Sequence, residues 1–139
     1  MILEICRCIC KRLLIVIITI IVIAEITTYS INELVGTKLR ALYQRKKGRD
    51  LFDMQVALDY GKIDIEKTLE CYNKYMEFVV DKAPTYKQFV QNMELKLQDS
   101  EFLDDTDILL RPDADKFDPQ RAYAMVKNTS IDRLPGKRD

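Results

Sequence analysis

The side chains best suited to chemistry gather in residues 37–53, which read TKLRALYQRKKGRDLFD. Six basic residues occur from Lys38 to Arg49 with no acidic residue among them, and Asp50 and Asp53 follow at once. The chain has no histidine, so imidazole catalysis and histidine metal ligands are excluded. A basic run beside two carboxylates is suited to binding phosphate groups or to forming ion pairs.

Lys38 lies on the side of its predicted helix that apolar residues occupy. At about 100° per residue, its direction falls between Leu34 and Leu42, with Val35 close by. An ammonium on a buried face is costly unless an anion meets it. The residues alone leave two roles open. One is a snorkelling or ion-paired structural lysine, which is the commoner case, and the other is a lysine that reaches a phosphate group.

Asp50 and Asp53 are three residues apart, so they share one face of a helix that begins near Asp50. The ordinary interpretation is that Asp50 caps this helix and Asp53 interacts with its dipole. The functional alternative pairs one of the carboxylates with the lysine or with a bound metal. A helix hairpin turning at Gly48 would bring the second helix back beside the first. We therefore predict that the Lys38 ammonium faces a groove lined by Asp50 or Asp53.

The other candidate groups carry weaker signals. A basic run such as residues 44–49 is a solvent-exposed face in most proteins, although it could also bind phosphate groups or an RNA backbone. The D-x-D pairs at 105–107 and 113–115 are interpreted as acidic surface, and the sequence contains no glycine-rich phosphate-binding motif. Cys6, Cys8 and Cys10 precede an apolar run with no second ligand cluster after them. Unpaired or lipid-modified cysteines are therefore favoured over a metal site.

Helical periodicity dominates the chain after residue 24, where glycine and proline are few. We expect six helices, each preceded by a residue that can cap it: Ser30, Asp50, Asp64, Thr85, Ser100 and Asp118. The predicted fold is mostly α, a small helical bundle over residues 25–130. A disordered tail is expected over residues 131–139.

Residues 1–24 form a separate apolar N-terminal segment. Its longest run without a charge, 13–24, has 12 residues, all apolar except Thr19, whereas a membrane-spanning helix needs roughly 20. Extension back through residues 9–24 would give a single-pass membrane anchor, with the preceding basic residues holding the N-terminus in the cytoplasm. A buried strand, a signal peptide and non-homologous coding are the alternatives. The domain after this segment is expected to be cytoplasmic.

The stretch AEITTYSINELVGTKLRALYQRKKGRDLFDM, residues 24–54, resembles the C-terminal half of the AbiEii/AbiGii nucleotidyltransferase toxin family. These proteins are the toxins of type IV toxin–antitoxin systems. The part from Glu33 to Asp53 matches the lysine motif and the R-D-x-x-D motif of the family. The later stretch DPQRAYAMVKN, residues 118–128, is similar to the last helix of the family.

This resemblance implies a fold like that of DNA polymerase β and a set of functional residues. Lys38, Asp50 and Asp53 would be catalytic, and Lys38 with Arg49 would bind the nucleotide. The substrate would be a nucleoside triphosphate (NTP) with Mg²⁺, and the acceptor an RNA. The resemblance also implies a cognate antitoxin expressed from the same operon and a role in abortive infection, a phage defence.

The sequence departs from the family in one large respect. The half of the family that carries a Gly-Ser motif and a metal-binding D-x-D pair has no counterpart in residues 1–23. Lysine and two acids can position a triphosphate, but two-metal transfer needs further carboxylates around both ions. We therefore expect a truncated toxin that is inactive alone. The alternative is a small, single-pass membrane-anchored helical interaction protein.

Overall fold

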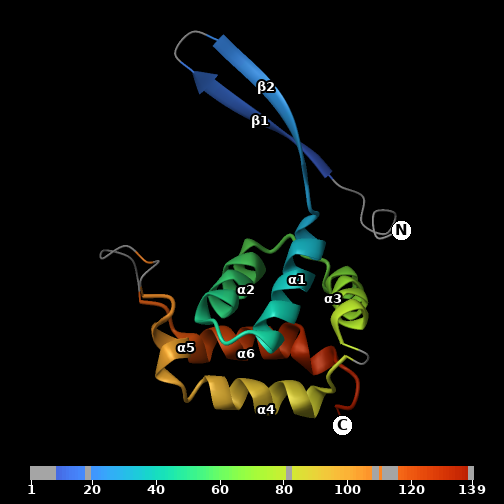
Figure 1. The fold of residues 1–139 in the computed structure, drawn as a ribbon, viewed down its shortest axis with the longest axis vertical. Helices are drawn as coiled ribbons and strands as arrows, with labels where there is room; N and C mark the ends of the chain where they lie inside the picture. The colour runs from blue at the N-terminus through green and yellow to red at the C-terminus, as the bar shows by residue number, and fades with distance from the viewer. Residues whose placement is uncertain (1–8, 18–19, 81–82, 108–109, 111–115, 138–139) are drawn as a thin grey trace.

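The computed structural model describes residues 9–17, 20–80, 83–107, 110 and 116–137 of the chain. A β-hairpin precedes a bundle of helices (Figure 1). The strands are β1 (Ile9–Ile17) and β2 (Ile20–Thr28). The helices are α1 (Ile31–Gln44), α2 (Gly48–Tyr60), α3 (Ile65–Val79), α4 (Tyr86–Lys96), α5 (Ser100–Asp104) and α6 (Pro119–Thr129), and the 3₁₀ helix η2 (Ile131–Arg133) follows. The predicted mostly α fold is confirmed.

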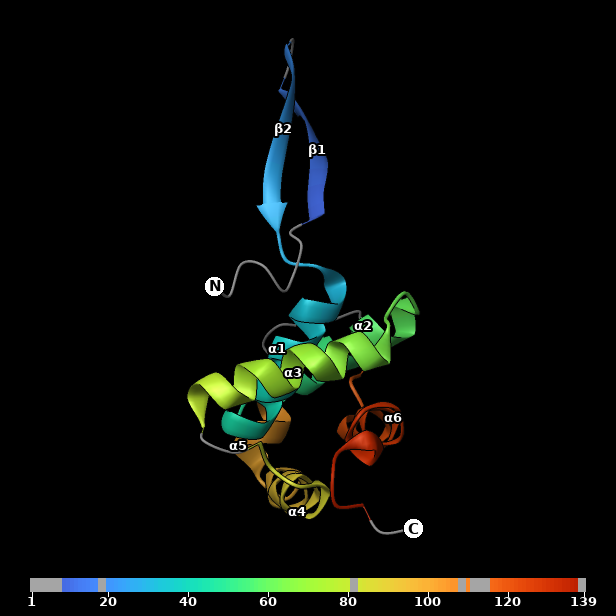
Figure 2. The same ribbon diagram turned by 90° about the vertical axis from the view of Figure 1, so that its right-hand side faces the viewer.

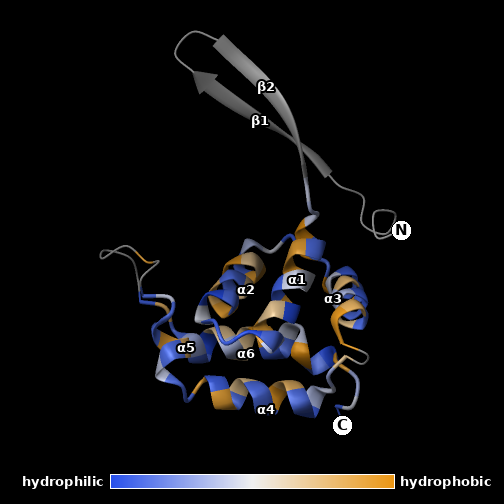
Figure 3. Cartoon of the chain, viewed as in Figure 1, coloured by the Kyte–Doolittle hydropathy of each residue, from blue (hydrophilic) through white to orange (hydrophobic). Residues whose placement is uncertain are grey.

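Helix α1 lies between α2 and α3, and α4 and α6 cross beneath them (Figures 1 and 2). Each helix carries both hydrophobic and hydrophilic residues along its length (Figure 3), as expected for helices that cover a shared core. The buried apolar side chains come from all six α-helices and from the C-terminal segment. The largest fully buried ones include Tyr72, Phe89, Phe102, Leu39 and Leu42. The apolar positions that the helical periodicity predicts to face the core are buried or partly buried, except Leu34 and Val79, which are 43 % and 51 % exposed.

Two glycines allow helices to approach more closely than any other residue would permit. A Cβ atom added at Gly36 would lie 2.8 Å from the Thr68 carbonyl oxygen, where α1 packs on α3. One added at Gly48 would lie 2.1 Å from the Phe102 carbonyl oxygen, where α2 begins against α5. Both contacts are with backbone atoms, which cannot rotate away, so both helix contacts depend on glycine.

Local capping interactions fix several helix starts. The Ser30 hydroxyl accepts a hydrogen bond from the Glu33 amide, 3.2 Å away, but the Glu33 carboxylate does not complete a capping box. It is buried and accepts a hydrogen bond from the Tyr75 hydroxyl at 2.7 Å. Thr85 and Gln88 do form the reciprocal capping box. Helix α5 is capped by Asp99 rather than by Ser100.

The expected disordered tail is instead ordered as far as residue 137. Ile131 is fully buried and Leu134 is 4 % exposed, so both side chains extend the hydrophobic core. The Pro135 carbonyl oxygen accepts a hydrogen bond from the Tyr86 amide at 3.0 Å. The tail contains proline, glycine and several charged residues, a composition typical of disordered segments. The burial of these two apolar side chains offsets part of the entropic cost of ordering the tail.

The described residues of the apolar N-terminal segment form strands, where the prediction of a membrane anchor required a helix. β1 and β2 pair antiparallel in a register that runs from Ile9 opposite Thr28 to Ile17 opposite Ile20. The hairpin extends from the start of α1 away from the bundle (Figure 1). The run is rich in Ile and Val, whose branched side chains favour extended backbone. Across the described residues, none of the helices has the length and apolar content that crossing a bilayer requires.

Some sequence candidates fall outside the described residues. They are Cys6, Cys8 and the D-x-D pair at 113–115, and the side chain of Cys10 is likewise not described. Their predicted roles therefore stay predictions.

Candidate functional site

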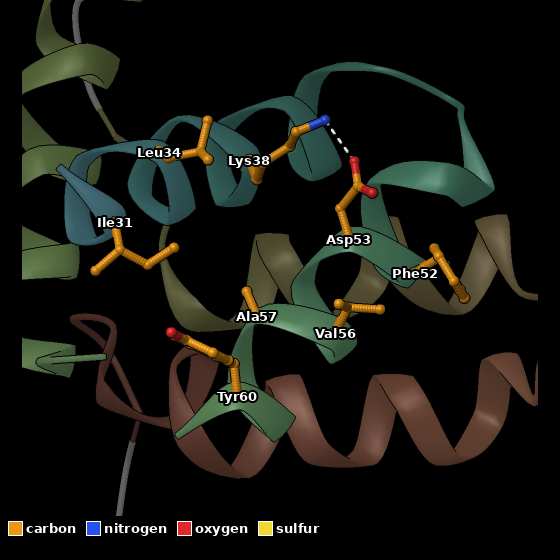
Figure 4. Close-up of a pocket in the computed structure, with 8 residues that line it drawn as sticks. All are labelled: Ile31, Leu34, Lys38, Phe52, Asp53, Val56, Ala57 and Tyr60. Carbon is orange, nitrogen blue, oxygen red and sulfur yellow. Dashed lines mark hydrogen bonds and ion pairs between the residues drawn. The ribbon is translucent and has the colours of Figure 1, made fainter. Parts of the chain in front are cut away.

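The Lys38 side chain meets carboxylates from α2, as predicted. Its Nζ atom donates a hydrogen bond to Asp53 Oδ2 at 2.5 Å and lies 3.6 Å from Asp50 Oδ1. Figure 4 shows the ammonium and the Asp53 carboxylate pointing toward each other across the two helices. Lys38 is 31 % exposed and Asp53 is 41 % exposed, so both remain accessible to a ligand. The prediction that Lys38 faces a groove rather than open water is confirmed.

Asp50 has a structural role different from the predicted helix cap. Helix α2 already begins at Gly48 with Lys47 at the capping position, so Asp50 lies inside the first turn. Its carboxylate is fully buried and accepts two hydrogen bonds from the Arg45 guanidinium, at 2.7 Å from Nη2 and 3.2 Å from Nε. Two-point binding of a carboxylate by arginine is among the stronger side-chain interactions. Arg45 thereby fixes the corner between α1 and α2.

Lys96 also approaches this corner, and the sequence analysis did not identify it. This α4 residue is 7 % exposed, and its Nζ donates hydrogen bonds to the carbonyl oxygens of Leu42, at 2.5 Å, and Tyr43, at 2.8 Å. Burial lowers the pKa of the Lys96 ammonium to about 8, and the negative charge of Asp50 opposes that shift. Lys96 therefore satisfies carbonyl groups of the last turn of α1.

A signal for Lys96 was present in the sequence. It follows Phe89 and Met93 at positions i, i+4 and i+7 of one helix, so it occupies the buried stripe of α4. Like Lys38, this lysine follows the apolar side of its helix, and that position indicates a buried ammonium.

Much of the basic run is already neutralised by acids that lie near α5. Lys46 forms an ion pair with Asp99, and Lys47 lies 3.6 Å from both Glu101 and Asp105. The hydrogen bond from Lys46 lowers the pKa of the Asp99 carboxyl. These contacts favour a structural role for Lys46 and Lys47 over the alternative of an RNA-binding run.

Arg49, which was expected to bind nucleotide, does not join Lys38. Its Nε lies 3.2 Å from Asp105 Oδ2, and its backbone amide donates a hydrogen bond to the same oxygen at 3.2 Å. Asp105 belongs to the D-x-D pair interpreted as acidic surface, and its carboxylate therefore holds the start of α2 against α5. The structure brings Asp50 and Asp53 to Lys38 but keeps Arg49 on another side of α2.

A groove between α1 and α2 begins at the Lys38–Asp53 pair (Figure 4). Its volume is about 610 Å³, within the range of small-molecule pockets. Apart from Lys38 and Asp53, the side chains that line it are apolar or aromatic: Ile31, Leu34, Phe52, Val56, Ala57 and Tyr60. The arrangement therefore offers one cation and one exchangeable carboxylate at the edge of an apolar surface.

The family implies Mg²⁺, and the described residues do not fit a magnesium cage. No group of three or more His, Cys, Asp or Glu side chains that could hold a metal occurs among them. Both oxygens of Asp50 accept hydrogen bonds from Arg45, and its carboxylate is buried. Asp53 is then the one accessible carboxylate of the R-D-x-x-D motif, and a single carboxylate does not form a two-metal site.

Comparison with known proteins agrees with the motifs. Residues 11–128 match the family described as "Nucleotidyl transferase AbiEii toxin, Type IV TA system". The matched range begins inside β1 and extends almost to the end of α6. Searches of curated proteins and of solved structures found no match. The match covers most of the chain and includes the lysine and R-D-x-x-D motifs, and the chain therefore belongs to the AbiEii nucleotidyltransferase toxin family of type IV toxin–antitoxin systems.

Proposed function

We propose that this chain positions the triphosphate of an NTP through Lys38, as the nucleotide-binding part of a nucleotidyltransferase toxin. The observation that carries the proposal is the geometry at Lys38. An accessible ammonium lies at the edge of a groove and is bound to a carboxylate that is itself partly exposed. Family membership supplies the class of substrate.

Binding exchanges one anion for another at the ammonium. A phosphate oxygen of the triphosphate replaces Asp53 Oδ2 at Lys38 Nζ. The released Asp53 carboxylate is partly exposed, so water can solvate it at little cost. Asp50 stays in place because Arg45 binds both of its oxygens. Within this proposal, Lys38 contacts the nucleotide, whereas Asp50 and Arg45 are positioning residues.

We further propose that the chain by itself binds a nucleotide without transferring it. Its 139 residues contain no Gly-Ser motif, and the carboxylates near Lys38 do not fit a two-metal site. The metal-binding groups would then come from outside these residues, and Mg²⁺ would supply charge neutralisation at the phosphoryl group there. An RNA acceptor and a cognate antitoxin are the partners that the family implies.

Calorimetric titration of the full chain with ATP, GTP, CTP and UTP tests the proposal. We expect binding of at least one NTP and a loss of at least tenfold in affinity for Lys38→Met, because an ammonium in contact with phosphate is removed. Lys87→Met is the matched control, since Lys87 is an exposed lysine of α4. Absence of binding by the folded chain, or equal affinities for both variants, would contradict the role of Lys38.

A further inference from the structure

The groove beside Lys38 has two ends of different chemistry. The ammonium and the Asp53 carboxylate form one end, and the aromatic ring of Tyr60 lies at the other, with Val56 and Ala57 between them (Figure 4). A nucleotide has the same division, because its phosphates are charged and its base is flat and aromatic. Lys38 is the one cation among the lining residues, so it favours binding of the phosphates at its own end of the groove.

We propose that the apolar part of this groove binds the nucleoside of the NTP, with its base against Tyr60 and with little discrimination among the four bases. This inference rests on the proposed function, because it assumes that Lys38 holds the phosphates. It adds a binding surface for the base, a residue that contacts it, and an expected specificity.

The spacing along α2 agrees with one bound nucleotide. Asp53 and Tyr60 are seven positions apart in the same helix, and at 1.5 Å per residue their Cα atoms are separated by about 10 Å along its axis. This separation is comparable to the distance between the phosphates and the base of an extended nucleotide. Both ends of the groove can therefore be occupied by one molecule.

Three large apolar or aromatic side chains that line the groove are exposed to solvent. Tyr60 is 63 % exposed, and the Leu34 and Val56 side chains are 43 % and 52 % exposed. Three such side chains around one groove form an apolar patch, and patches of this type commonly mark interaction sites. The Lys62 ammonium lies 5.2 Å from the centroid of the Tyr60 ring. This contact helps to hold the ring in place while it remains accessible.

The composition of the groove determines the expected specificity. Among the eight lining residues, only Lys38, Asp53 and Tyr60 carry side-chain groups able to form hydrogen bonds. The first two lie at the phosphate end, so among the lining side chains only the Tyr60 hydroxyl could contact the polar edge of a base. Strong selection requires several buried polar groups that pair with the correct ligand. Stacking, by contrast, accepts every base. We therefore expect the four NTPs to bind with affinities within about tenfold of one another.

The test compares ATP with inorganic tripolyphosphate, which has the phosphates but no nucleoside. In calorimetric titrations of the full chain, we expect ATP to bind at least fivefold more tightly than tripolyphosphate. Tyr60→Ala should weaken ATP binding by about 5- to 10-fold, because it removes a stacking surface, and should leave tripolyphosphate binding unchanged. Tyr60→Phe keeps the ring and should retain the affinity for ATP.

Phe78→Ala provides the matched control, because Phe78 is an aromatic residue of α3 that is also strongly exposed and does not line the groove. It should bind both ligands as the parent chain does. Circular dichroism verifies that each variant keeps its helices.

The possible outcomes separate this inference from the proposed function. If tripolyphosphate and ATP bind equally, or if Tyr60→Ala leaves ATP binding unchanged, the nucleoside does not lie in the groove although Lys38 still binds phosphate. A preference of a hundredfold or more for one base would overturn the expected lack of discrimination. If neither ligand binds, the proposed function fails and this inference fails with it.

Discussion

Lys38 and Arg45 both pair with the carboxylates of α2, but we predict that their removal has opposite consequences. The comparison uses Lys38→Met and Arg45→Met, which replace each cation by an unbranched apolar side chain. Lys38→Met should leave the free energy of unfolding nearly unchanged and weaken nucleotide binding. Arg45→Met should destabilise the protein substantially. The difference arises because removal of Lys38 leaves the exposed Asp53 without its partner, whereas removal of Arg45 does so for the buried Asp50.

The exposure of the two carboxylates determines the magnitudes. Without Lys38, Asp53 loses a hydrogen bond but is 41 % exposed and can be solvated, while Asp50 keeps both bonds from Arg45. We expect a cost below about 1 kcal/mol, as for exposed ion pairs. Without Arg45, the fully buried Asp50 loses both of its hydrogen bonds and keeps the Lys38 ammonium, 3.6 Å away, and the charge of the nearby Lys96. Leaving a buried carboxylate poorly paired should cost about 2–3 kcal/mol.

Urea unfolding followed by circular dichroism measures both costs, and calorimetry with ATP measures binding by each folded variant. Lys87→Met again serves as the control for loss of an exposed lysine charge. A cost for Lys38→Met that equals or exceeds the cost for Arg45→Met would refute the reasoning. It would mean that the ion pair with Lys38, and not the contact with Arg45, holds Asp50 in the fold.

Four further predictions test individual contacts. Gly48→Ala places a Cβ about 2 Å from the Phe102 carbonyl oxygen. The free energy of unfolding of this variant, measured in urea, should therefore be about 1–3 kcal/mol lower than that of the parent chain. Ile131→Ala should cost about 2–4 kcal/mol in the same assay, because the residue is fully buried, whereas a disordered tail would show no effect. Asp53→Asn should raise the calorimetric affinity for tripolyphosphate several-fold, because a competing anion at the lysine is removed. Burial lowers the Lys96 pKa from 10.5 to about 8, so between these pH values the unfolded chain binds more protons than the folded protein. The free energy of unfolding should therefore rise from about pH 8 to pH 10. Urea unfolding across that range should show no such rise for Lys96→Met.

The sequence alone predicted those features that depend on local pattern. The helix periodicity, the capping by Asp64, Thr85 and Asp118, and the orientation of Lys38 all follow from residues close to one another in the chain. Apolar spacing placed Lys38 toward the neighbouring helix, and the short connection around Gly48 indicated which helix that would be. The family motifs were recognised in the same stretch.

Features that depend on distant residues were not predicted. Asp99 and Asp105 neutralise the basic run from about 50 residues away, and no periodicity in residues 37–53 indicates which acids will meet it. Lys96 reaches the end of α1 only because α4 passes beneath it. Asp50 resembled a capping residue because the sequence did not show that α2 starts two residues earlier, at Gly48. The apolar N-terminus was ambiguous because Ile and Val runs suit both strands and membrane helices.

The tertiary contacts distinguish Lys38 from the other basic residues of 37–53, most of which form structural ion pairs. Arg45 fixes the buried Asp50, and Lys46, Lys47 and Arg49 hold the start of α2 against acids near α5. Among the described residues that line the groove, Lys38 is the one member of the run. Its partner, Asp53, is accessible and therefore exchangeable, whereas Asp50 is buried and held from the other side. The run thus makes the corner of the helix hairpin rigid, and this rigidity keeps the Lys38 ammonium at the edge of the groove, where the proposed triphosphate would bind.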